Sequence, residues 1–100
     1  MRESKIEKEL CKRVKAKGGI CLKFTSPGFN GVPDRIVMLP DGHMGFVETK
    51  APGKKPRLFQ EHVHLIFKKL GQPVFVLDDI DNIDALLYMI ETYLPKGVNT

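Results

Sequence analysis

The strand, helix and strand predicted between residues 44 and 78 constrain the fold more than any other feature. Residues 44–50 read MGFVETK and residues 73–78 read PVFVLD, two apolar runs of strand length. Between them, a helix should begin near Pro56 or Arg57 and end at Gly71, because apolar residues recur at helical spacing: Phe59, Val63, Ile66 and Leu70. Since such a crossover returns the chain to the same sheet, we expect 44–50 and 73–78 to be parallel neighbours.

Two further helices and a hairpin complete the pattern. A helix is predicted over residues 2–17, because apolar residues recur every four positions before a Gly-Gly pair: Ile6, Leu10 and Val14. Residues 20–25 alternate with the period of a half-buried strand whose apolar side is Ile20, Leu22 and Phe24. Residues 34–39 and 44–50 flank a PDGH turn and form a hairpin, and a third helix covers 80–94 before Pro95. The order α-β-β-β-α-β-α predicts an α/β fold with a mixed sheet flanked by helices.

The composition is that of one folded domain. The chain has 100 residues, of which 42% are apolar and 28% charged, so we expect a single domain over residues 1–100. It contains no apolar run near the roughly 20 residues that span a bilayer, and its basic amino terminus lacks the apolar stretch of a signal peptide. We therefore expect a cytoplasmic protein without a membrane partner. Cys11 and Cys21 have no zinc-binding spacing, so we expect reduced, packed thiols.

Three charged residues stand at the ends of the two hairpin strands. Asp34 follows a Gly-Val-Pro turn, and Glu48 and Lys50 close the second strand. Burying an unpaired charge is costly, so charges beside a core usually bind a metal, a substrate or each other. Glu48 and Lys50 share one strand face by alternation. Asp34 joins them only if the hairpin pairs residue 34 with residue 48 or 50.

An acidic pair with an adjacent amine is the minimum set for cutting a phosphodiester bond. Two carboxylates hold a hard divalent cation, which neutralises phosphate charge and lowers the pKa of a bound water, while a lysine positions or activates that water. The structural alternative is that Asp34 ends a turn and Glu48 pairs with Lys50 or a helix lysine. The flanking turn, apolar strands and hairpin, which occur in the required order, favour the metal-binding interpretation.

The motif GVPDR, followed by FVETKAPGKKPR and Gln60, resembles the VRR-NUC branch of the PD-(D/E)xK nuclease superfamily. Small stand-alone members of this branch are typical of phages and prophages, whose proteins act in the cytoplasm of a bacterial host. The resemblance runs from the first helix through residues 73–78. It implies a restriction-endonuclease-like mixed sheet flanked by helices, Mg²⁺- or Mn²⁺-dependent cleavage of DNA, a leaning toward branched DNA such as four-way (Holliday) junctions, and a homodimer.

The resemblance also implies roles for individual residues. Asp34 and Glu48 would be metal ligands together with the Thr49 carbonyl, and Lys50 would be the catalytic amine. Thr49 stands where the family often has Leu in an E-L-K version of the motif, which should not matter if only its carbonyl is used. Gln60 matches a family glutamine and would orient a water or a phosphate; the alternative is a plain helix-surface residue.

A glutamate of the first helix completes the set that the resemblance implies. Glu3 and Glu7 both fall on the side of the apolar stripe, whereas Glu9 points elsewhere. We favour Glu7 as a catalytic and metal-binding residue, because it fits the family's I-E-x-x-L arrangement and lies a full turn inside the helix. Glu3 remains the alternative.

A net charge of +4 favours an anionic partner. We expect contacts to DNA from basic residues of the loop after Lys50 and of the first two strands: Lys54, Lys55, Arg57, Lys23 and Arg35. His62 and His64 do not share a helical face and have no cysteine partner at zinc spacing, so we expect both at the surface. His43, in the hairpin turn, should also be solvated.

Two rival functions remain open from the sequence. A DNA-binding module could keep this fold without catalysis, although acidic residues would weaken phosphate binding at such a site. A nuclease of different specificity, such as a flap, single-strand or restriction-like nuclease, is also compatible with the sequence.

Overall fold

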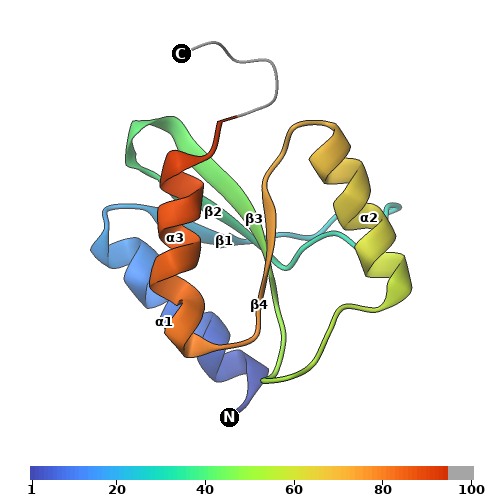
Figure 1. Cartoon of the computed structure of the whole chain (residues 1–100), viewed down its shortest axis with the longest axis horizontal. Helices are drawn as coiled ribbons and strands as arrows, with labels where there is room; N and C mark the ends of the chain where they lie inside the picture. Colours follow the sequence, from blue (N-terminus) through green and yellow to red (C-terminus); the bar gives the residue numbers. More distant parts are fainter. Residues whose placement is uncertain (95–100) are drawn as a thin grey trace.

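The computed structural model describes residues 1–94, which form a four-stranded sheet with helices on both faces (Figure 1). Short 3-10 turns, η1 (Pro40–Gly42) and η2 (Ile80–Asn82), precede β3 and α3. The predicted order α-β-β-β-α-β-α is confirmed. The main elements are α1 (Glu3–Ala16), β1 (Ile20–Lys23), β2 (Arg35–Leu39), β3 (His43–Thr49), α2 (Leu58–Lys69), β4 (Val74–Leu77) and α3 (Ile83–Thr92).

The strands lie side by side in the order β1-β2-β3-β4. The first three are antiparallel, and β3 and β4 are parallel, as the crossover predicts. The β2–β3 register pairs Arg35 with Val47. One step further along the same register, Asp34 lies opposite Glu48. The condition for bringing Asp34 onto the face of Glu48 and Lys50 is therefore met.

Helices α1 and α3 cover one face of the sheet (Figure 1). Gly45 of β3 allows α3 to approach closely, because a Cβ atom there would lie 2.9 Å from Ile90. The buried core on this face takes residues from the sheet and both helices: Ile6, Leu10, Val14, Val37, Leu39, Val47, Leu77, Ile83, Leu86, Leu87 and Ile90.

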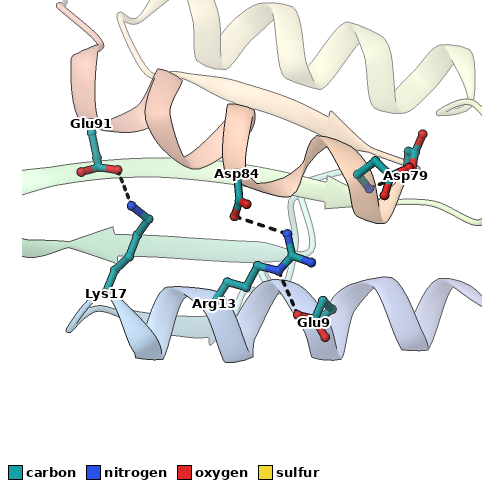
Figure 2. A network of polar contacts seen from close by, with 7 residues as sticks. Glu9, Arg13, Lys17, Asp79, Asp84 and Glu91 are labelled. Atoms are coloured by element: carbon teal, nitrogen blue, oxygen red, sulfur yellow. Dashed lines mark hydrogen bonds and ion pairs between the residues drawn. The ribbon is translucent and has the colours of Figure 1, made fainter.

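Ion pairs connect α1 and α3 at the outer edge of this layer (Figure 2). Arg13 Nη1 lies 3.3 Å from Asp84 and its Nε lies 2.9 Å from Glu9, while Lys17 lies 3.1 Å from Glu91. Exposed pairs of this kind contribute about 0–1 kcal/mol each, so apolar packing holds the helices to the sheet.

Helix α2 rests on the opposite face through a narrow strip. Val63 is buried, and the Phe67 ring lies edge-on to Phe46 with centroids 5.0 Å apart. Phe59 and Leu70, two other members of the predicted stripe, are 56% and 73% exposed. The predicted stripe is too wide, because α2 contacts the sheet along one line only.

The buried side of β1 is also opposite to the predicted one. Cys21 packs toward the core beside α1, whereas Ile20 and Leu22 are 52% and 40% exposed. The strand ends at Lys23, although the Phe24 amide still donates to the Asp34 carbonyl at 2.8 Å. Phe24, the third residue of the predicted apolar side, is half-buried and its ring packs near Phe46 of β3 and Phe67 of α2. The alternation is as predicted, but α2 does not cover Ile20 and Leu22.

Two smaller predictions are refined by the structure. The third helix is shorter than 80–94, because its first three residues form η2. Pro95, its predicted stop, lies outside the described residues. Cys11 and Cys21 are free and half-buried, with their Sγ atoms 2.8 Å apart, and burial raises the pKa of Cys21 to about 12.

Across residues 1–94, every helix is too short or too polar to cross a membrane.

Candidate active site

Asp34 is held by the loop before it and by the end of β3. Gly31 has φ +86°, and a Cβ atom there would lie 2.9 Å from Phe59 and from Val63. Only glycine therefore lets the Gly-Val-Pro turn pass beneath α2. Beyond the turn, Asp34 Oδ2 accepts hydrogen bonds from the Thr49 amide at 2.9 Å and the Thr49 hydroxyl at 3.0 Å. The carboxylate is thus fixed to the strand that carries Glu48.

Glu48 is buried, with 1% of its surface exposed. Its Oε2 atom accepts from Lys50 Nζ and from Gln60 Nε2, both at 3.1 Å. Lys50 stays on the same face because its amide continues the parallel ladder to the Leu77 carbonyl at 2.9 Å. Glu48, Lys50 and Gln60 therefore form one contact group between β3 and α2.

Gln60 has a fixed orientation. Its Oε1 accepts from the Arg57 amide at 3.0 Å, which closes the first turn of α2, and its Nε2 is then free to donate to Glu48. The sequence left open whether Gln60 is a plain surface residue. The structure places it against Glu48.

The charges in this group act on one another. Burial raises the pKa of Glu48 above its ordinary value, the nearby Asp34 charge adds to the rise, and Lys50 opposes it. Burial also lowers the pKa of His64, with the positive charges of Lys68 and Lys50 acting in the same direction and Asp34 opposing them. An acidic pair in which one charge raises the pKa of the other is the arrangement that a cation relieves.

The donor set fits a hard divalent cation. Asp34 and Glu48 supply carboxylate oxygens, and the Thr49 carbonyl points to the Asp34 side because the N–H and C=O of a strand residue point the same way. Across residues 1–94, no group of three or more His, Cys, Asp and Glu side chains is placed to hold a metal. Two carboxylates are nevertheless sufficient for Mg²⁺, which commonly keeps several waters and takes further oxygens from substrate phosphates.

Glu7 is not brought to this pair. Its Oε2 accepts from Arg35 Nε at 2.9 Å. Arg35 follows Asp34 directly, so its side chain lies on the opposite sheet face, under α1. Glu3 is the α1 carboxylate whose charge acts on Glu48 and raises its pKa. Figure 1 accordingly shows the start of α1 beside the end of β3.

The basic residues predicted to contact DNA divide into two groups. Lys54, Lys55 and Arg57 are exposed in the loop that joins Lys50 to α2, and Lys23 is exposed at the end of β1. Arg35 differs, because its side chain is only 18% exposed and is paired with Glu7. The structure therefore leaves four of the five side chains open to a large anionic partner.

His64 also lies beside Glu48, which the sequence pattern did not predict. The prediction that it lies at the surface is wrong, since it is 5% exposed and its Nε2 lies 3.8 Å from Glu48 Oε1. His62 is exposed as predicted, and His43 is half-buried at the start of β3. The usable signal was the spacing from Gln60, because residues four apart share a helix face.

Comparisons with known proteins found a similar sequence and a similar solved structure. No protein-family model matches the chain. A protein of Acyrthosiphon pisum secondary endosymbiont phage 1, named "Putative nuclease p44", is 52% identical over 81 residues, which cover 81% of this chain and 87% of that protein. A solved structure described as a VRR_NUC domain superposes with a TM-score of 0.79 and 35% identity, covering 92% of this chain and 97% of the other.

Proposed function

Because this chain belongs to the VRR-NUC family of nucleases, we propose that it is a Mg²⁺- or Mn²⁺-dependent endonuclease that hydrolyses phosphodiester bonds in branched DNA such as four-way junctions. The observation that carries the proposal is the acidic pair Asp34 and Glu48 with Lys50 bound to Glu48 at 3.1 Å. The leaning toward branched DNA rests on the family resemblance.

In this proposal Asp34 and Glu48 hold the cation, and the Thr49 carbonyl is an additional ligand. When bound, a divalent cation offsets negative charge on the phosphate and acidifies a coordinated water. Thr49 binds Asp34 through Oδ2, which leaves Oδ1 as the oxygen that would hold a cation. The Thr49 contacts hold that carboxylate in one orientation before substrate arrives, which lowers the cost of assembling the site.

Lys50 and Gln60 act on the reacting groups. Both donate to Glu48 Oε2. They are therefore close enough to contact a phosphate that is bound at Asp34 and Glu48. Lys50 orients the attacking water and offsets developing negative charge, and Gln60 orients the water or a phosphate oxygen. Such positioned groups typically contribute 10²–10⁴-fold to the rate.

The exposed basic loop binds the DNA backbone. The loop directly after β3 carries Lys54, Lys55 and Arg57, so these side chains can contact phosphates next to the one that is cut. Lys23 contributes from β1. These contacts carry no base specificity, and they make binding weaker as the salt concentration rises.

The test is cleavage by the wild type and by Asp34→Asn in Mg²⁺, in Mn²⁺ and in excess EDTA. We expect Asp34→Asn to abolish cleavage and to bind DNA as tightly as the wild type or more tightly, because it removes a charge that repels phosphate. His62→Gln, which changes an exposed residue, is the matched control and should cut normally. Undiminished cutting by Asp34→Asn, or cutting in EDTA, would contradict metal-dependent catalysis.

A panel of DNA structures tests the substrate. Four-way junctions, flaps, forks, single strands and plain duplex should be compared at equal concentration, and we expect the four-way junction to be cut fastest. Faster cutting of flaps or single strands would replace the junction proposal with the corresponding nuclease activity. Tight binding to DNA without cutting of any substrate would point to a non-catalytic module.

A further inference from the structure

Two buried polar atoms face each other beside the acidic pair. Glu48 Oε1 and His64 Nε2 are 3.8 Å apart, and neither has a hydrogen-bond partner among the described residues. Their side chains are 1% and 6% exposed. An unsatisfied buried polar group lowers the stability of the fold by about 1–3 kcal/mol. Two such atoms side by side are therefore expected only where they serve a function.

The two oxygens of Glu48 have different surroundings. Oε2 is turned to Lys50 and Gln60, two residues that are partly exposed to solvent. Oε1 is turned inward to His64. The inner oxygen is therefore the one that a protein group can hold while the outer oxygen serves a ligand.

Helix α2 supplies a hydrogen-bonding side chain for each oxygen. Gln60 and His64 are four residues apart and share one face of the helix. The packing of Val63 in the core and of Phe67 against Phe46 fixes that face over β3. His64 is consequently held against Glu48 by apolar contacts on both sides of its turn.

We propose that His64 is a positioning residue that donates its Nε2–H to Glu48 Oε1 and so holds Oε2 toward the cation. The inference rests on the proposed metal-dependent function. A shift of about 1 Å brings 3.8 Å to hydrogen-bonding distance, and rotation of either side chain supplies it. Ligating carboxylates are commonly oriented by such an outer hydrogen bond, and its loss costs about 10–100-fold in metal affinity or activity.

A neutral imidazole suits this role. An uncharged imidazole carries one N–H donor, and burial lowers the pKa of His64 from its ordinary value. A neutral donor can orient the carboxylate without competing with a cation for its negative charge.

The experiment measures Mn²⁺ binding to the DNA-free protein by electron paramagnetic resonance of the unbound ion, together with thermal unfolding without metal. We expect His64→Leu to weaken Mn²⁺ binding about 10–100-fold. His64→Gln should retain most of the affinity, because its amide nitrogen reaches the position of Nε2. His62→Leu, an exposed change on the same helix, should bind normally. Without metal, the unfolding temperature of His64→Leu should fall, since the variant leaves the buried Glu48 Oε1 without a partner, whereas His64→Gln should unfold near the wild-type temperature.

The outcomes separate this inference from the proposed function. A wild type that binds no Mn²⁺ and cuts DNA in EDTA would end both. A wild type that binds Mn²⁺, combined with unchanged affinity in His64→Leu, would overturn only the positioning role. Equal losses in the Leu and Gln variants with lowered unfolding temperatures would show that His64 acts by packing, which also contradicts the inference.

Discussion

Glu48 is the residue at which function and stability conflict most directly. Its carboxylate is 1% exposed, and burial together with the Asp34 charge raises its pKa. Lys50 and Gln60 satisfy one oxygen and leave the other without a partner among the described residues. A core selected for stability alone would carry a neutral side chain here, so the charge at this position is expected to serve the reaction.

Glu48→Gln should therefore stabilise the fold while removing activity. The Gln carbonyl can accept from Lys50 and Gln60, and its NH₂ group can donate to His64 Nε2, because a neutral imidazole can carry its single proton on Nδ1 instead. Because the folded-state pKa of Glu48 lies above its ordinary 4.5, the folded wild type binds more protons than the unfolded chain between those two values. Wild-type stability thus falls as pH rises through that window, and the advantage of the variant should grow to about 1–3 kcal/mol at neutral pH.

Urea unfolding of both proteins between pH 4 and pH 8 measures this difference. The two stabilities should converge at the acid end, where Glu48 is protonated in both states. A variant that is less stable than the wild type at pH 7.5 would show that the charged form of Glu48 is favourable in the fold.

Lys50 and Lys54 test the difference between a catalytic lysine and a phosphate contact. Lys50 donates to Glu48, whereas Lys54 is exposed in the following loop. Lys50→Ala should lower kcat about 10²–10⁴-fold, and Lys54→Ala should mainly weaken binding and reduce its salt dependence. Single-turnover cleavage at two salt concentrations distinguishes them. Equal losses that low salt restores in both variants would make Lys50 another phosphate contact.

At the scale of the elements, α1 contributes to both sheet faces. Its apolar stripe and Glu7 serve the face under α1, where Glu7 binds Arg35. Its first turn lies near the end of β3, where the Glu3 charge reaches Glu48. Two glutamates of one helix therefore meet different surroundings.

Glu3→Gln and Glu7→Gln form a matched pair for the helix carboxylate. We expect Glu3→Gln to weaken Mn²⁺ binding with little change in stability, because Glu3 is exposed and acts on Glu48 by its charge. Glu7→Gln should instead lower stability by about 1 kcal/mol through loss of the partly buried pair with Arg35. Mn²⁺ titration and urea unfolding measure the two effects. Loss of Mn²⁺ binding in Glu7→Gln at unchanged stability would restore the ligand role that the family resemblance implies for Glu7.

At the scale of the whole molecule, the helices cover the sheet unevenly. Helices α1 and α3 bury one face, while α2 leaves apolar side chains uncovered on the other. Ile20 and Met38 are cross-strand partners and are 52% and 39% exposed, and Leu22 beside them is 40% exposed. A contiguous apolar row of this kind is typical of a surface that another molecule covers.

The homodimer is the last prediction. A junction-cutting enzyme must nick two strands of like polarity, and two active sites related by a twofold axis supply that geometry. Sedimentation at micromolar concentration should give twice the 11.3 kDa chain mass. We expect Leu22→Lys to give monomers, whereas Tyr88→Lys, at an exposed position on α3, should remain dimeric. A strict monomer that cuts four-way junctions symmetrically would refute the argument from symmetry.

The sequence by itself determined the order of the elements and the placement of Glu48 and Lys50 on one strand face. Alternation along β3 puts Glu48 and Lys50 on one face whatever surrounds them, and a hairpin turn restricts the register that places Asp34. Strand alternation and turn geometry are local properties, because each depends only on residues that are close together in the chain. The family resemblance rests on the same residues, and the similarity to the VRR_NUC structure confirms it. The single domain over residues 1–100 stays a prediction.

Only the tertiary structure decided which side chains surround that pair. His64 is buried beside Glu48 because α2 packs over β3. Glu7 binds Arg35 because Arg35 lies under α1. Ile20 is exposed because α2 does not extend over β1. In each case the outcome depends on the element that packs opposite. A residue's own periodicity tells which way it points, but its burial and its partner depend on segments far away in the chain.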